Sequence, residues 1–224
     1  MAALAIQGAA SRPGTDIVMT DPSRQAHWDN VYASKGEKDV SWYQDSPTPS
    51  LDLIALTGLS ADAEIIDIGG GASRLVDTLL RENFGRWTVL DLSGAALDAA
   101  KERLGESAAR VTWVVADVTT WQPSQTYDLW HDRAAFHFLI DQADQSAYVA
   151  RLKQAVRPAG FVIIGTFAPD GPERCSGLPI VRHDATALAA KLGDEFELID
   201  ARRHEHTTPW GAVQRFQFAT FRRH

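Results

Sequence analysis

The sequence predicts an α/β protein built on a largely parallel sheet, and three observations support this fold class. A β-branched strand, a run of glycines and an amphipathic helix follow one another within residues 64–80. Further apolar, strand-like segments recur along the chain and alternate with helical patterns, which is typical of parallel sheets. Two last strand-like segments, at 195–203 and 213–221, are separated only by a short loop, so we expect an antiparallel hairpin to close the sheet.

The first strand and its glycine turn are the most informative stretch. Residues 64–68 read E-I-I-D-I, and their β-branched side chains suit a strand that is buried on both faces. Three glycines follow at 69–71, and a helical pattern follows at 75–80. Strand, glycine turn and helix form the first half of a nucleotide-binding crossover, in which glycine lets a ligand approach the backbone. Taken alone, the turn could equally be a tight connection between strand and helix.

The spacing of the glycines helps to decide which nucleotide would bind. Dinucleotide-binding folds use G-x-G-x-x-G, and here Gly69 and Gly71 fit the first two positions while Arg74 occupies the third. In the alternative pattern G-x-G-x-G the third position is Ser73, which is small. A serine in place of glycine is a milder departure than an arginine, so the spacing favours an S-adenosylmethionine (SAM) site over a dinucleotide site.

The next two predicted strands, at 86–91 and 111–117, both end in an acid. Asp91 comes about 20 residues after the glycine turn, the distance at which an acid takes the hydroxyls of a ribose. Asp117 ends the following strand in the same way. A single aspartate at a strand end is often a helix cap or a solvated turn residue. Because both acids are in register with the glycine turn, we interpret both as ligand-binding groups.

The remaining segments complete the alternation. They are a strand at 127–132, a helix at 141–156, a strand at 161–167, a short helix at 184–192 and the two closing strands. The longer helix is expected to end at residues 157–160, R-P-A-G, because proline cannot continue a helix and glycine suits the exit.

With these motifs the chain resembles the class I SAM-dependent methyltransferases, from about Trp28 to the C-terminus. The resemblance implies a single Rossmann-like, seven-stranded methyltransferase sheet with helices on both faces and a C-terminal antiparallel hairpin. It implies SAM as cofactor and S-adenosylhomocysteine (SAH) as product. In that family the Asp91 position binds the ribose diol and the Asp117 position faces the adenine amino group. Carried over by position, this part of the cofactor site comprises Gly69, Gly71, Asp91, Leu92, Asp117 and Val118.

An aromatic box lies near the N-terminus. Trp28 and Tyr32 are four residues apart and so share one face of a predicted helix, and Trp42 follows a short turn. Packing of that helix over the sheet edge is an equally open interpretation. The pattern W-x-x-x-Y…W-Y resembles two groups, the elongation-factor and citrate-synthase lysine methyltransferases and the thiopurine and tellurite methyltransferases. In such families the segment folds over the cofactor, which implies that these three side chains line the SAM pocket.

The residues after the fourth strand bear on the substrate. The lysine-methyltransferase group has an acidic-K-G-T-L-D pattern there, whereas residues 132–137 read D-R-A-A-F-H. The acid and the base are kept, but the glycine and the second acid are lost, so the pattern does not support a protein-lysine substrate. The resemblance leaves Arg133 as a neighbour of the cofactor's carboxylate. The alternative role for Arg133 is a salt bridge with Asp128 or Asp141.

We therefore interpret the chain as an enzyme that transfers a methyl group from SAM to an unidentified acceptor, either a small molecule or a protein side chain. The alternatives are a SAM-binding regulatory protein without turnover and a nicotinamide-dependent oxidoreductase, against which Arg74 and the closing hairpin argue. A general base is needed only if the acceptor is protonated. Asp132 and His131 are the nearest candidates, and no motif identifies a dedicated catalytic group.

Length and charge limit the remaining possibilities. A chain of 224 residues suffices for one α/β core, and we expect a disordered leader at 1–21 and the methyltransferase domain at 22–224. The net charge of −7 argues against non-specific nucleic-acid binding. Neither a membrane span nor a signal peptide is expected, and the oligomeric state stays open.

The single cysteine, Cys175, excludes an intrachain disulfide and fits a reducing cytoplasm. The histidines and this cysteine match no zinc spacing, so we expect no metal site.

Overall fold

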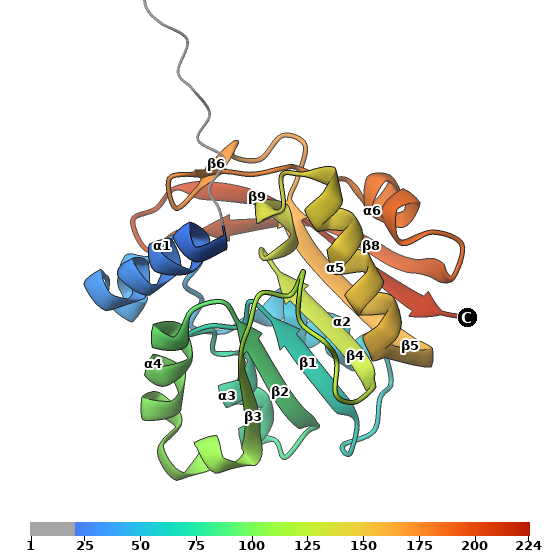
Figure 1. Cartoon of the computed structure of the whole chain (residues 1–224), viewed down its shortest axis with the longest axis horizontal. Coiled ribbons are helices and arrows are strands. Elements are labelled where there is room, and N and C mark those ends of the chain that lie inside the picture. The colour runs from blue at the N-terminus through green and yellow to red at the C-terminus, as the bar shows by residue number, and fades with distance from the viewer. Residues whose placement is uncertain (1–20) are drawn as a thin grey trace, which may run out of the picture.

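The computed structural model describes residues 21–224, and the leader expected at 1–21 lies outside the described residues except for its last residue. Across the described part the chain forms one seven-stranded mixed sheet, as predicted (Figure 1). From one edge to the other its strands are β3 (Val111–Val115), β2 (Arg86–Asp91), β1 (Glu64–Ile68), β4 (Tyr127–Arg133), β5 (Val156–Phe167), β9 (Val213–Arg223) and β8 (Phe196–Thr207). The first five strands are parallel, and β9 runs antiparallel to both β5 and β8.

Helices cover both faces of the sheet; Figure 1 shows α5 in front of it and α2 behind. They are α1 (Asp21–Ser34), α2 (Thr48–Leu56), α3 (Leu75–Arg81), α4 (Gly94–Leu104), α5 (Gln142–Ala155) and α6 (Ala185–Leu192). Side chains alternate along a strand, so Ile65 packs in the core shared with α2, α3 and α4, whereas Ile66 packs in the core shared with α5 and α6. This burial on both faces explains the continuous apolar runs in the central strands.

The order of the strands places the site. The chain passes from β1 to β2 and β3 on one side and then returns to β4 on the other side of β1. At such a switch point, the loops that follow the neighbouring strands separate and leave a crevice at their carboxyl ends. The glycine turn follows β1, and Asp91 is the last residue of β2. The fold therefore brings the sequence motifs to one crevice.

Two boundaries differ from the prediction. β5 starts at Val156, so residues 157–160 belong to a strand and not to a helix exit. Arg157 holds this segment beside β4 through a pair of hydrogen bonds to Asp128 at 2.7 and 2.8 Å, and Ala159 takes a positive φ of 62°. The closing hairpin is also longer than expected, because His204 and His206 continue the pairing of β8 with Phe216 and Gln214 of β9.

The pattern reading did not identify α2, α4 or the two-residue strands β6 (Arg174–Cys175) and β7 (Leu178–Pro179). The start of α4 is set by Ser93, whose hydroxyl accepts a hydrogen bond from the backbone N–H of Ala96 at 3.1 Å. Within residues 21–224, none of the helices is both long enough and apolar enough to cross a lipid bilayer.

Candidate functional site

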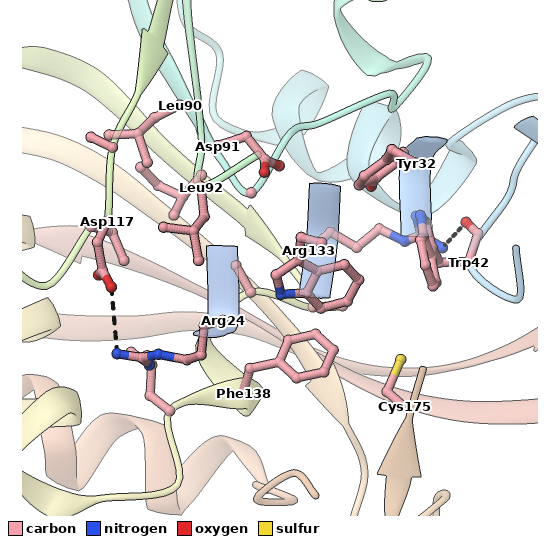
Figure 2. A pocket seen from close by; sticks show the side chains of 18 residues that line it. Arg24, Tyr32, Trp42, Leu90, Asp91, Leu92, Asp117, Arg133, Phe138 and Cys175 are labelled. Atoms are coloured by element: carbon pink, nitrogen blue, oxygen red, sulfur yellow. Dashed lines mark hydrogen bonds and ion pairs between the residues drawn. The ribbon is translucent and has the colours of Figure 1, made fainter. Parts of the chain in front are cut away.

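A cavity of about 130 Å³ lies in the crevice at the carboxyl ends of β1, β2, β3 and β4 (Figure 2). Nine of the ten predicted cofactor residues line it: Trp28, Tyr32, Trp42, Gly69, Asp91, Leu92, Asp117, Val118 and Arg133. The tenth, Gly71, lies directly behind Asp91 and Tyr32. The structure thus brings together residues that are more than 100 positions apart in the sequence.

The glycine turn is shaped so that no side chain fits. Gly69 and Gly71 have φ values of 64° and 43°, which L-residues adopt only with strain. A Cβ atom on Gly69 would lie 2.7 Å from the Cβ atom of Ala135. A Cβ atom on Gly71 would lie 2.8 Å from the hydroxyl of Tyr32 and 2.9 Å from Oδ2 of Asp91. Glycine at both positions therefore keeps the floor of the cavity open.

Asp91 presents a buried carboxylate to the cavity. Its Oδ1 accepts a hydrogen bond from the backbone N–H of Ser93 at 2.8 Å, and its side chain is almost fully buried. Burial raises the pKa of Asp91 to about 7, and the nearby carboxylates of Asp67 and Asp29 push it in the same direction. A buried acceptor with unused lone pairs fits the hydroxyl groups of a ribose, which would donate to it.

Asp117 lies two residues beyond β3, at the other end of the cavity from Trp42 (Figure 2). Its Oδ1 is committed to the loop, since it accepts from the backbone N–H and the hydroxyl of Thr119 at 2.8 and 2.7 Å. Its Oδ2 pairs with the guanidinium of Arg24 at 3.4 Å, and Arg24 also pairs with Asp144 of α5 at 3.2 Å. A ligand amine that donates to Asp117 would therefore share it with Arg24.

Four aromatic rings, which we call the aromatic roof, cover the cavity: Trp28, Tyr32, Trp42 and Phe138. The ring centroid of Trp28 lies 5.0 Å from that of Phe138 and 5.7 Å from that of Trp42, and Tyr32 lies 6.2 Å from Trp42. These contacts hold α1 against the loop after β4. A further hydrogen bond of 2.6 Å from the Ser93 hydroxyl to Asp29 fastens α1 to the start of α4.

Arg133 reaches from the end of β4 toward Trp42, as Figure 2 shows. Its Nη2 donates to the backbone carbonyl of Trp42 at 2.9 Å, and its guanidinium carbon lies 5.6 Å from the ring centroid of Phe216. Neither salt bridge considered from the sequence forms: Asp128 pairs with Arg157, and Asp141, at the start of α5, lies beyond salt-bridge distance of Arg133. Desolvation lowers the pKa of Arg133 to about 10, so the side chain stays charged at neutral pH.

The two candidate bases lie in the core and do not line the cavity. The carboxylate of Asp132 accepts from the backbone N–H groups of Ala135 and Phe136, at 2.9 and 3.0 Å, and from the hydroxyl of Tyr148 at 2.7 Å. It therefore fixes the loop that follows β4. This placement corrects the expectation that Asp132 is available to a ligand.

The same correction applies to His131. Its Nδ1 lies 2.7 Å from Oδ1 of Asp67, and its Nε2 lies 2.8 Å from the hydroxyl of Ser50. Both ring nitrogens are thus engaged between β1 and α2. The pattern could not reveal this, because Ser50 and Asp67 are remote in the sequence and meet His131 only in the folded core.

Sequence reasoning missed nine of the residues that line the cavity, among them Arg24, Phe138 and Cys175. Arg24 precedes the aromatic box by one helical turn, a signal that was available. Cys175 arrives from the separate hairpin of β6 and β7, and burial raises the pKa of its thiol to about 11. Within the described residues there is no cluster of three metal-ligating side chains.

Comparison with known proteins shows what the chain is similar to. Residues 65–160, which run from β1 into β5, match the family model described as a methyltransferase domain. This part of the chain is therefore similar to a methyltransferase domain. The two subgroups that the aromatic box resembles stay a hypothesis.

Individual relatives agree with this assignment. A trans-aconitate 2-methyltransferase from Paracidovorax citrulli is 30% identical over 126 residues, which are 54% of this chain and 46% of that protein. The chain thus spans about half the length of the curated relatives it matches. The N-methyltransferase NodS from Bradyrhizobium japonicum in complex with SAH superposes with a TM-score of 0.67 at 17% identity, over 87% of this chain and 99% of NodS. A SAM-dependent methyltransferase from Anabaena variabilis superposes with a TM-score of 0.71 at 14% identity, over 97% of this chain and 100% of that protein. These two structures show the shared fold.

Proposed function

We propose that this protein binds SAM beneath α1 and transfers its methyl group to a small-molecule acceptor. When bound, SAM supplies a methyl group on a sulfonium, and the carbon–sulfur bond breaks as the acceptor's lone pair forms the new bond, which leaves SAH. The observation that carries the proposal is the convergence of the glycine turn, Asp91 and Asp117 on one roofed cavity. Gly69, Gly71 and Asp91 would hold the ribose side of the cofactor, and Asp117 would meet its adenine with Leu92 and Val118 beside it.

A small acceptor is favoured over a protein side chain by the aromatic roof. The ring centroid of Trp28 lies 5.0 Å from that of Phe138 and 5.7 Å from that of Trp42, and the three rings cover the cavity. A side chain on a folded protein needs an open groove through which it can reach the cofactor. The similarity to an enzyme named for trans-aconitate, a small molecule, points in the same direction.

We propose that the protein catalyses the reaction by positioning the acceptor against the methyl group of SAM. Besides its carboxylates and the two arginines Arg24 and Arg133, the described wall of the cavity offers the hydroxyl of Tyr32 and the thiol of Cys175 as titratable groups. Burial raises the pKa of both, so neither accepts a proton at neutral pH. The acceptor therefore arrives with a free lone pair, and the cavity orients that lone pair toward the methyl group and excludes water.

We place the protein in the cytoplasm, without a membrane or nucleic-acid partner. The single cysteine, which is buried as a free thiol, and the net charge of −7 support this placement. Fractionation of cells that produce the protein tests the placement directly.

Ligand binding followed by turnover tests the proposed function. Calorimetry should show that SAH binds and NADH does not, and SAH should raise the melting temperature, because a ligand that binds only the native state stabilises it. A larger thermal shift with NADH would refute the assignment. Isotopically labelled SAM and a cell lysate, split into protein and small-molecule fractions, should then give label in the small-molecule fraction. Binding of SAH without transfer of label to either fraction would instead indicate a SAM-binding regulatory protein.

A further inference from the structure

Arg133 is a charged group that has no counter-charge among the residues that the structure describes. Within residues 21–224, no carboxylate lies within salt-bridge distance of its guanidinium, which makes one hydrogen bond, to the carbonyl of Trp42. The carboxylate of Asp67 favours the charged form of Arg133 from a distance, but it is already paired with His131 at 2.7 Å. A partly buried cation without a partner is costly, and a bound anion would remove that cost.

The guanidinium occupies one end of the cavity. Asp117 lies at the opposite end, Asp91 lies between the two ends, and Arg133 extends toward Trp42 with Cys175 nearby (Figure 2). Arg133 also lies against the ring of Phe216, on a strand that is separated from β4 by β5 and lies on the side away from β1 and β2. A cofactor whose adenine lies at Asp117 and whose ribose lies at Asp91 would direct its sulfonium toward this end, which is where a methyl acceptor has to meet it.

From this arrangement we infer that the methyl acceptor is a small anion with a flat apolar body, and that Arg133 recognises its negative group. The inference rests on the proposed function and adds the chemical class of the acceptor. The guanidinium offers donors in a planar fork that matches a carboxylate. The rings of Trp28, Trp42 and Phe138 provide faces and edges against which a flat body packs. Arg133 is thus a specificity-determining residue that needs no role in proton transfer.

An anion also fits the charge of the reaction. The sulfonium of SAM is positive, and so is Arg133, so a neutral or cationic acceptor between them would leave two like charges facing each other. An anionic acceptor is attracted by both. The protonated thiol of Cys175 and the protonated phenol of Tyr32 add no competing negative charge at neutral pH.

The test measures binding to the full chain saturated with SAH, where no turnover interferes. Benzoate is the probe, and benzamide, which has the same shape without the charge, is its control. We expect calorimetry to show that benzoate binds at least about tenfold more tightly than benzamide. The variant Arg133→Met should lose this preference and keep its SAH affinity within about threefold. Lys101→Met removes a cation from the outer surface of α4 and should change neither value.

Each other outcome overturns the inference in a recognisable way. Equal binding of benzoate and benzamide, or no binding of either, would show that the site does not select an anion. If Arg133→Met lowers SAH affinity about tenfold and abolishes the preference for SAH over its decarboxylated analogue, Arg133 holds the cofactor's carboxylate instead. Arg133→Lys keeps the charge and guards against a folding defect, since it should retain part of the benzoate affinity. Failure of the wild type to bind SAH would refute the proposed function itself.

Discussion

Asp91 shows how a single side chain depends on its surroundings. The carboxylate is buried at the end of β2, it lies close to two other acids, and its pKa is raised to about 7. The protein tolerates this cost because the position faces a cavity in which hydroxyl donors can bind. Perturbed carboxylates of this kind are often found at functional sites.

Replacement of Asp91 by asparagine should weaken SAH binding at least about tenfold, because charge-assisted hydrogen bonds to two ribose hydroxyls are lost. Binding of those donors favours the ionised carboxylate, so the pKa of Asp91 falls when SAH binds. The wild type should therefore release a proton near pH 7, and its SAH affinity should rise as the pH rises through about 7. Calorimetry in buffers of different ionisation enthalpy measures the proton. The surface variant Asp98→Asn should still release this proton when SAH binds. Unchanged SAH affinity in Asp91→Asn would mean that the ribose lies elsewhere.

Asp117 should distinguish adenine from its deaminated form. Its Oδ2 can accept from the exocyclic amine of adenine but is repelled by the carbonyl of inosine. S-inosylhomocysteine should therefore bind more weakly than SAH, and the gap should shrink in Asp117→Ala. Asp144→Ala removes the other acid that pairs with Arg24 and should leave the gap unchanged. Competition binding measures both variants, and an identical gap in wild type and Asp117→Ala would exclude base reading by this residue.

Among the secondary-structure elements, α1 stands out because its contacts connect several loops at once. Arg24 reaches Asp117 after β3, Asp29 accepts from Ser93 after β2, and Trp28 packs on Phe138 after β4. The helix is thus held by single side-chain contacts rather than by a broad apolar face. Such an element can detach while the sheet stays folded.

Trp42→Ala tests whether the aromatic roof is a movable cover. Trp42 is only partly buried, so its loss should lower SAH affinity more than it lowers the melting temperature of the ligand-free protein. Trp87 in β2 is 2% exposed and serves as the core control, since Trp87→Ala should cost about 3–5 kcal/mol of stability. Binding isotherms and thermal unfolding measure the two effects. A ligand-free protein that unfolds on Trp42→Ala would identify this ring as part of the core.

At the scale of the whole molecule, buried ionisable groups make stability depend on pH. Burial lowers the pKa of His137 to about 3 and that of His183 to about 4. Both histidines must stay neutral in the folded state, so their contribution to stability is lost as the pH falls below about 6.5. Asp91 and Asp132 have raised pKa values, so their contribution is instead lost as the pH rises toward 7.

A comparison of the wild type with His137→Leu isolates the contribution of His137 to the pH dependence of stability. Wild type should lose about 2 kcal/mol through His137 between pH 7.5 and pH 5, because the unfolded chain takes up a proton that the folded chain refuses. His137→Leu is less stable at pH 7.5 for lack of the hydrogen bond to Phe167, but its stability should fall less over the same pH range. Urea unfolding at the two pH values measures this. Parallel losses in the two proteins would show that His137 does not control acid stability.

The sequence allowed the sheet and the cofactor side of the cavity to be predicted, because local patterns determine both. β-branched runs, a glycine turn and acids at strand ends are visible without the fold, and β2 begins and ends at the expected residues. The structural roles of Asp132 and His131 could not be predicted from the sequence. Asp132 accepts a hydrogen bond from Tyr148 and His131 contacts Ser50, and these partners come close only when the helices pack. The start of β5 was missed for a similar reason, because pairing with β4 overrides the local signal of proline.

The fastening of α1 over the cavity has a consequence for the timing of the reaction. A cover that closes on the nucleoside and whose underside forms the wall for the acceptor imposes a sequence on ligand arrival, with SAM first and the acceptor second. The departures follow in reverse, and SAH is the last to leave. If the aromatic roof moves in this way, we expect the slow event in each cycle to be the lifting of α1 rather than the making of a bond. Accumulated SAH would therefore slow the protein more effectively than accumulated methylated product.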